Sequence, residues 1–146
     1  MTAIHIALGV ALIAVNAVAG LYGAYAWWQD RPAPGFWPLL RAGQAFVIIE
    51  AVDGAVLLLI GRDLPQLHLI YGLLPIGVSF FAEQLRLTTA ENVLAQRGLE
   101  GRADVERLGA PEQRELVRVI VRREIGVMAA SALVVALLGV RAAGGL

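Results

Sequence analysis

Residues 3–28 read AIHIALGVALIAVNAVAGLYGAYAWW, and this stretch decides the fold class. It holds no Asp, Glu, Lys or Arg. A hydrocarbon core about 30 Å thick requires roughly 20 apolar residues of helix to cross it, and residues 3–28 exceed that length. Trp27 and Trp28 at the end of the stretch are typical of the membrane–water interface. The stretch therefore predicts a helix that spans a membrane.

Three further apolar segments follow it, separated by glycines and prolines that end helices. We predict one all-helical domain over residues 1–146, a four-transmembrane-helix bundle with spans at about 3–28, 38–61, 66–86 and 120–141. The connection at 87–119 is highly charged but has apolar residues at helical spacing. We expect it to form helical extensions of the third and fourth spans, packed on each other. A surface-lying amphipathic segment is the alternative.

Composition excludes several function classes. The chain is 58% hydrophobic with zero formal net charge, so nothing suggests a nucleic-acid partner. It has no cysteine, which excludes disulfides, thiolate metal sites and thiol catalysis. No phosphate-binding loop or hydrolase motif is present, and we do not expect an enzyme. Residues 1–10 lack the basic start of a signal peptide, so we expect the first span to be retained.

The arginines predict the orientation, because cytoplasmic connections carry an excess of basic residues. Ten of the twelve lie in the connection between the first and second spans, in the one between the third and fourth, or in the span ends next to these connections. Only Arg62 and Arg141 lie on the other side. We therefore expect a multi-pass protein of the cell (inner) membrane, with both termini outside and the connection 87–119 in the cytoplasm.

Polar residues within the apolar segments form the first candidate site, which we expect at Glu50, Asp53, Asn16 and Ser79. A charge at the bilayer centre costs at least ~2.5–3.5 kcal/mol, and such residues are usually functional. Glu50 and Asp53 lie one turn apart near the middle of the second span. We expect at least one to be protonated, or a cation to sit nearby. Proton relay and ion coordination suit these carboxyls; interhelical packing is the alternative.

The two histidines form a second candidate site. His5 and His68 are expected near the outer ends of their spans, where imidazoles at one level could ligate a b-type haem or a metal ion. Tyr71, one turn after His68, is a neighbour of this site. The alternative is a structural role for His68, bonded to Asp63 or to a backbone group. We expect no resident cofactor, with haem b as the alternative.

At the inner face, charged residues of the third and fourth spans are expected at one level. Arg86 with Glu124, or Glu83 with Arg123, would form ion pairs that join the two spans.

The segment from Leu67 to Gly72, LHLIYG, resembles a segment of bacterial four-span membrane proteins that carry an L-H-x-x-Y-G element. The resemblance covers the second and third spans. It implies the membrane topology and no particular activity.

Three hypotheses for function follow. The first is a non-enzymatic accessory or oligomeric membrane subunit, held together by its buried polar stripe, whose partners are the lipid bilayer and a second copy or a membrane complex. The second is a small proton- or cation-coupled permease or channel that uses Glu50 and Asp53. The third is a b-haem membrane anchor that uses His68 and His5.

Overall fold

The computed structural model describes residues 3–62 and 65–144, and within these ranges it contains helices and no strand. The helices are α1 (Ala3–Gln29), α2 (Phe36–Leu59), α3 (Gln66–Gln96), α4 (Arg102–Arg107) and α5 (Ala110–Ala142). The prediction of an all-helical protein is confirmed. The segment 87–119 contains the end of α3, all of α4 and the start of α5.

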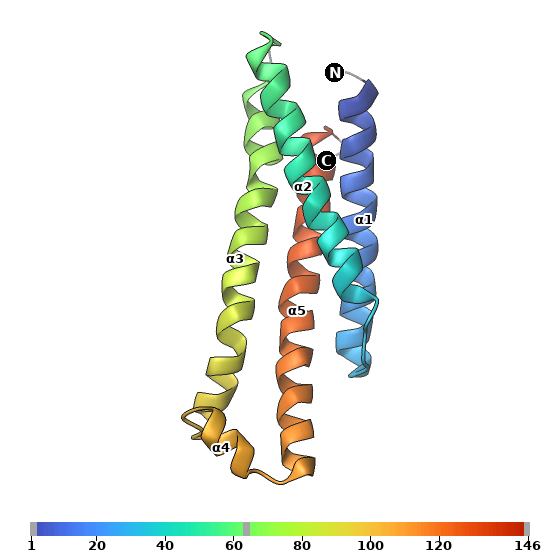
Figure 1. Ribbon diagram of the computed structural model, residues 1–146. Helices are drawn as coiled ribbons and strands as arrows, with labels where there is room; N and C mark the ends of the chain where they lie inside the picture. Colours follow the sequence, from blue (N-terminus) through green and yellow to red (C-terminus); the bar gives the residue numbers. More distant parts are fainter. Residues whose placement is uncertain (1–2, 63–64, 145–146) are drawn as a thin grey trace.

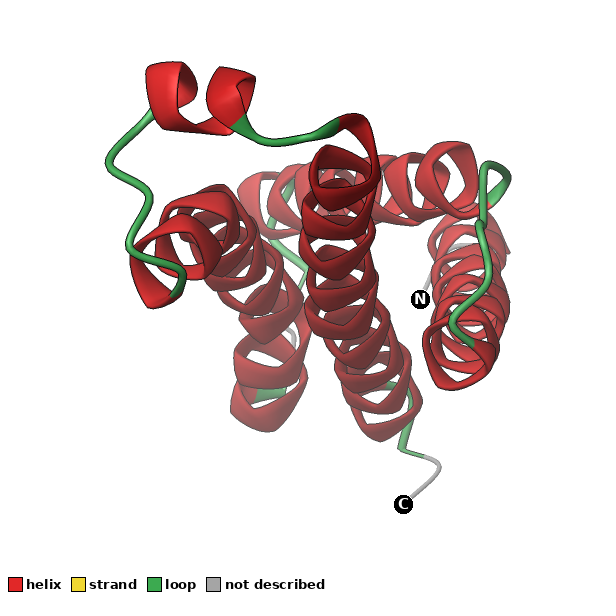
Figure 2. Cartoon of the chain, turned by 90° about the horizontal axis from the view of Figure 1, so that it is seen from below, coloured by secondary structure: helices red, strands yellow, loops and turns green. Residues whose placement is uncertain are grey.

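The long helices run up and down in one bundle (Figure 1). α5 packs against both α1 and α3, α1 packs against α2, and α2 touches α3 much less. Both ends of the described chain lie at the end of the bundle where α2 connects to α3. At the opposite end, α3 and α5 extend beyond α1, and α4 links them (Figures 1 and 2).

Glycines and prolines set the helix ends, as their positions in the sequence predict. Gly61 after α2 and Gly98 after α3 have φ of 79° and 67°, the left-handed conformation that commonly ends a helix. α3 begins directly after Pro65 and continues through Pro75. α5 begins with Pro111 in its first turn, where the Glu112 carboxylate accepts a hydrogen bond of 3.0 Å from the Gly109 N–H.

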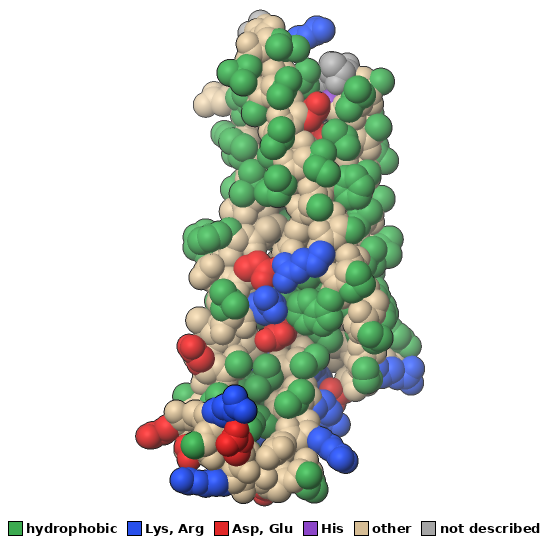
Figure 3. Space-filling view, in the orientation of Figure 1, with side chains coloured by type: hydrophobic (Ala, Val, Ile, Leu, Met, Phe, Trp, Pro, Cys, Tyr) green, Lys and Arg blue, Asp and Glu red, His purple; other side chains and the backbone are tan. Residues whose placement is uncertain are grey.

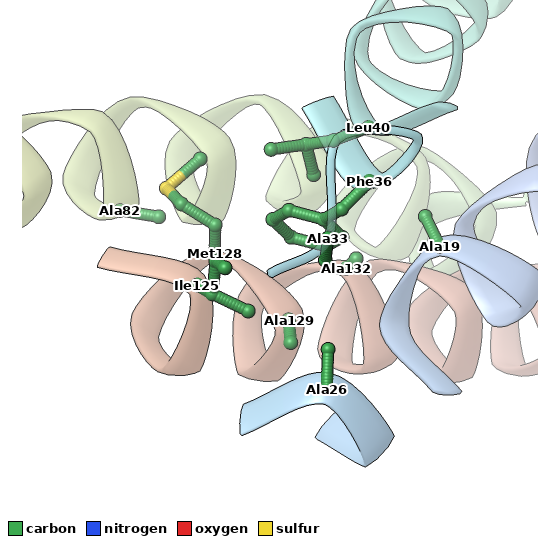
Figure 4. Close-up of a cluster of buried hydrophobic side chains, with 10 residues drawn as sticks. All are labelled: Ala19, Ala26, Ala33, Phe36, Leu40, Ala82, Ile125, Met128, Ala129 and Ala132. Atoms are coloured by element: carbon green, nitrogen blue, oxygen red, sulfur yellow. The ribbon is translucent and has the colours of Figure 1, made fainter. Parts of the chain in front are cut away.

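Small side chains bring the helices close together around α5. The largest buried cluster consists of Ala19, Ala26, Ala33, Phe36, Leu40, Ala82, Ile125, Met128, Ala129 and Ala132. Figure 4 shows these side chains converging on α5 from its neighbours. The alanines leave room for the Phe36 ring, which is completely buried. Packing of small residues of this kind is what holds helices together in lipid, where the hydrophobic effect gives no drive to association.

α1 and α2 pair in a regular antiparallel register that repeats every seven residues. At each step a glycine on one helix faces a larger side chain on the other. A Cβ on Gly23 would lie 2.4 Å from the Phe36 ring, and one on Gly43 would lie 2.7 Å from Asn16 Oδ1. One on Gly9 would lie 3.2 Å from Glu50 Oε1. A step of seven residues towards the start of α1 therefore corresponds to a step of seven residues towards the end of α2.

Three of the helices, α1, α2 and α5, are long and apolar enough to cross a membrane. Large apolar side chains are exposed along much of the bundle. In Figure 3 hydrophobic side chains cover the upper part of the visible face, and most charged side chains gather in its lower half. A surface of this composition fits a protein that lies in lipid.

Candidate functional site

The end of the bundle where α2 connects to α3, the upper end in Figure 1, holds a cluster of ionisable side chains around His5. His5 is only 5% exposed. Its Nδ1 atom lies 2.9 Å from Asp53 Oδ2 and 3.3 Å from Glu50 Oε1. One imidazole nitrogen of α1 thus faces both carboxyls of α2. Gly9 leaves space for this approach, since an added Cβ atom would lie 3.2 Å from Glu50 Oε1.

His68 extends this cluster to α3 and α5. Its Nε2 atom lies 3.4 Å from His5 Nε2, and its Nδ1 atom lies 2.9 Å from the carbonyl oxygen of Ala142. A carbonyl only accepts hydrogen bonds, so His68 Nδ1 carries the proton and, in a neutral ring, Nε2 is the acceptor. His5 Nε2–H then donates to His68. The contacts form one chain across α1, α2, α3 and α5.

A cavity of about 400 Å³ adjoins the chain of contacts. His5, Glu50, His68 and Tyr71 line it together with apolar side chains of all the long helices. The Arg141 guanidinium lies 5.1 Å from the centre of the Tyr71 ring, where a cation is attracted to the aromatic face. Glu50 Oε2 is buried and has no hydrogen-bond partner among the described residues. Such an atom is costly to bury, so this carboxyl is suited to receive a proton or a cation.

The two candidate sites that the sequence suggested are therefore one. Sequence reasoning placed Glu50 and Asp53 at mid-span and the histidines near the outer ends. The structure brings both carboxyls and both imidazoles together, with Tyr71 beside the same cavity. Asp63, the other partner considered for His68, lies outside the described residues.

Asn16 and Ser79 do not belong to this cluster. Asn16 is 2% exposed, and its Nδ2 donates to the carbonyl oxygens of Leu12 (2.9 Å) and Gly43 (3.2 Å). It joins α1 to α2 seven residues along each helix from the contact of Gly9 with Glu50, about two helical turns further along the bundle. Ser79 is half-buried and makes no side-chain hydrogen bond within the described ranges. The expected four-residue site thus divides into an acidic pair, a structural asparagine and an isolated serine.

A second ionic cluster joins α2 to α3 lower in the bundle. Glu83 forms an ion pair with Arg41, accepts a hydrogen bond of 2.9 Å from Gln44, and lies 2.9 Å from Arg86 Nε. Arg86 Nη1 also lies 3.9 Å from Glu124 Oε2, the expected contact between α3 and α5.

The alternative pair of Glu83 with Arg123 does not form. Adjacent residues of a helix point about 100° apart, so Glu124 faces Arg86 while Arg123 faces away. Arg123 instead lines a different cavity, beside Trp27. Sequence reasoning missed the contact of Arg41 with Glu83, because it counted Arg41 only among the basic residues of the inner side and looked for the partner of Glu83 in the fourth span.

A haem does not fit between the two imidazoles as they stand. Bis-histidine ligation requires a flat macrocycle between two Nε2 atoms. Here these atoms face each other directly at 3.4 Å, and the rings are inclined by 57°. The donor set of nitrogen and carboxylate oxygen is instead one that binds protons or metal ions.

Comparison of the chain with profiles of protein families, with curated proteins and with solved structures found no match.

Proposed function

We propose that the protein is a small proton- or cation-coupled permease of the cell membrane that uses Glu50 and Asp53. The observation that carries the proposal is the chain of contacts from these two carboxyls through His5 and His68 to the Ala142 carbonyl. Carboxyl and imidazole groups in hydrogen-bond contact exchange protons readily. Ionisable groups inside a membrane protein typically mark proton or ion pathways.

The proposal includes four spans, with α3 as the fourth. α3 lies along α5, which is itself apolar enough to cross a membrane. The outward side chains Leu73, Phe80 and Phe81 are 57–68% exposed, as expected for a face in contact with lipid. The arginine distribution supports termini outside and residues 87–119 in the cytoplasm, where the ends of α3 and α5 continue as helices.

An apolar layer separates the upper cluster from the ionic cluster around Glu83. It consists of Leu12, Val47 and Val135, all of them at most 5% exposed. A dry constriction of this kind blocks water and ions. The bundle therefore suits a carrier that rearranges to pass its cargo better than it suits an open channel.

A second copy of the chain, or a partner in a membrane complex, is part of this proposal because four spans are few for a carrier. Most glycines of α1 and α2 already face neighbouring helices. An added Cβ on Gly77 of α3 would have no described atom within 4 Å, so this position leaves room for close approach of another helix.

A non-enzymatic accessory subunit is the second candidate. The contact of Asn16 with the Gly43 carbonyl favours it, because this buried polar group joins two helices and has no place in the proton chain. Such a subunit would need the ionisable cluster only for stability.

Proton movement in proteoliposomes tests the first candidate. With a pH-sensitive dye inside the vesicles, an imposed gradient of at least one monovalent or divalent cation is expected to change the internal pH. Glu50→Gln and Asp53→Asn should each reduce the change to that of protein-free vesicles, because an amide cannot take up and release the proton. Glu91→Gln, which alters an exposed acid of α3, is the matched control and should keep the wild-type rate.

Wild-type vesicles that move no protons under any cation gradient would refute the permease. Proton movement that persists in both variants would show that transport does not depend on Glu50 or Asp53. Variants that unfold more easily than the wild type, together with a wild type that moves no protons, would favour the accessory subunit.

A further inference from the structure

Three potential metal ligands converge on one point between α1 and α2. His5 Nδ1, a Glu50 oxygen and an Asp53 oxygen all lie within 4.8 Å of one another. They come from a histidine near the start of α1 and from two acids one turn apart on α2. Their convergence is therefore a property of the helix register rather than of a flexible loop.

Two separations within this set are close to those between neighbouring ligands of one ion. Metal–nitrogen and metal–oxygen bonds of about 2.1 Å at tetrahedral angles place neighbouring ligand atoms about 3.4 Å apart. His5 Nδ1 lies 2.9 Å from Asp53 Oδ2 and 3.3 Å from Glu50 Oε1. The third separation, between the Glu50 and Asp53 oxygens, is within 4.8 Å, so one ion could contact all three groups.

His68 orients His5 in the way that partners of metal-binding histidines do. A ligating imidazole normally donates its other ring N–H to a fixed acceptor, which sets its tautomer. His5 Nε2 faces His68 Nε2 at 3.4 Å, and the Ala142 carbonyl fixes the proton of His68 on Nδ1. With Nε2 directed at His68, His5 presents Nδ1 to both acids, and this nitrogen would ligate an ion in place of its present contact with Asp53.

Charge and space also favour an ion at this point. Two carboxylates side by side in a bundle within lipid repel each other, and a divalent cation would cancel both charges. The buried Oε2 atom of Glu50, without a hydrogen-bond partner in the described part of the chain, would gain a second interaction. The adjoining cavity of about 400 Å³ gives room for water as a remaining ligand.

We propose that His5, Glu50 and Asp53 bind a divalent first-row transition-metal ion of the Zn²⁺ or Mn²⁺ kind, and that this ion is the cargo. Imidazole with carboxylate suits these ions, whereas soft ions such as Cu⁺ prefer sulfur. The chain has no cysteine, and Met128 lies in the core cluster around α5. The cargo assignment rests on the permease proposal.

Calorimetric titration of the purified protein with Zn²⁺, and the visible spectrum after Co²⁺ addition, test the site directly. We expect one ion per chain, proton release on binding, and a Co²⁺ band that reports nitrogen and oxygen ligands. Glu50→Gln and Asp53→Asn should each abolish saturable binding. Glu91→Gln should leave it unchanged.

His68→Gln tests the positioning role of His68. It should weaken Zn²⁺ binding about 10- to 100-fold, the usual loss when the partner of a ligating histidine is removed. The Co²⁺ band should keep its position because the ligands remain. A shift of the Co²⁺ band in His68→Gln would instead show that His68 is itself a ligand.

The metal site would be refuted if the wild-type protein showed no saturable Zn²⁺ binding. It would also be refuted if Glu50→Gln and Asp53→Asn both bound Zn²⁺ as tightly as the wild type. These results are separable from failure of the permease. Binding without transport leaves the site in place and removes the cargo assignment, whereas proton movement without metal binding leaves the permease and removes the site.

Discussion

Replacing His5 by leucine should lower the free energy of unfolding by about 3–5 kcal/mol, the usual cost when a buried charged group loses its partner. The His5 imidazole contacts both Glu50 and Asp53. Without it, two carboxyls remain side by side in a poorly solvated position. Unfolding in mixed detergent micelles, followed by circular dichroism, measures the loss.

The triple variant His5→Leu, Glu50→Gln, Asp53→Asn is the control for this prediction. Neutral amides need no counter-charge, so the triple variant should recover most of the lost stability. Substitutions in one network are not additive, and the difference between the single and triple variants measures the coupling. A triple variant less stable than His5→Leu alone would show that the three groups do not act on one another.

Cysteine labelling should give an all-or-none pattern that reports the number of spans. The chain has no cysteine, so single substitutions at exposed Ile60, Gln96 and Ala143 need no prior removal of native thiols. A thiol reagent that does not cross membranes should label Ile60→Cys and Ala143→Cys from outside intact cells. It should reach Gln96→Cys only after the cells are opened.

The same experiment distinguishes four spans from three. If only α1, α2 and α5 crossed the membrane, α3 would stay on the side of Ile60. Gln96→Cys would then be labelled with Ile60→Cys, and Ala143→Cys would be protected. That pattern would remove α3 from the membrane and reverse the orientation of α5.

The helices could be predicted from the sequence because their signals are local. An uncharged apolar stretch indicates a span, and Gly61, Pro65, Gly98 and Pro111 indicate ends and starts. These features act on neighbouring backbone groups alone. The observed bounds of α1 and α2 accordingly lie within two residues of the predicted spans.

The level of the acidic pair could not be predicted because it depends on a connection. The segment 30–35 runs back along α1 before α2 begins (Figure 1). Asp30, with φ of 51°, lies at the turn. Phe36 consequently lies beside Gly23 rather than beside Gln29, and this shift brings Glu50 and Asp53 to the level of His5.

A signal for this register was nevertheless present in the sequence. Gly9, Asn16 and Gly23 are spaced by seven residues, and so are Phe36, Gly43 and Glu50. Matching each glycine of one helix to a large side chain of the other gives the observed pairing directly. Such complementarity of small and large residues is a packing rule rather than a local propensity, so it becomes informative only when two helices are compared.

Both imidazoles of this chain lie in one cluster with the acids of α2. Because the protein has only two histidines, solid-state NMR of ¹⁵N-histidine-labelled protein in bilayers observes this cluster without overlap. We predict His68 protonated at Nδ1, a through-space correlation between the His5 and His68 Nε2 atoms at about the 3.4 Å observed here, and a contact of His5 Nδ1 with carboxyl carbons. Two imidazoles without a mutual correlation, with His5 in contact with lipid or water alone, would show that this cluster does not exist.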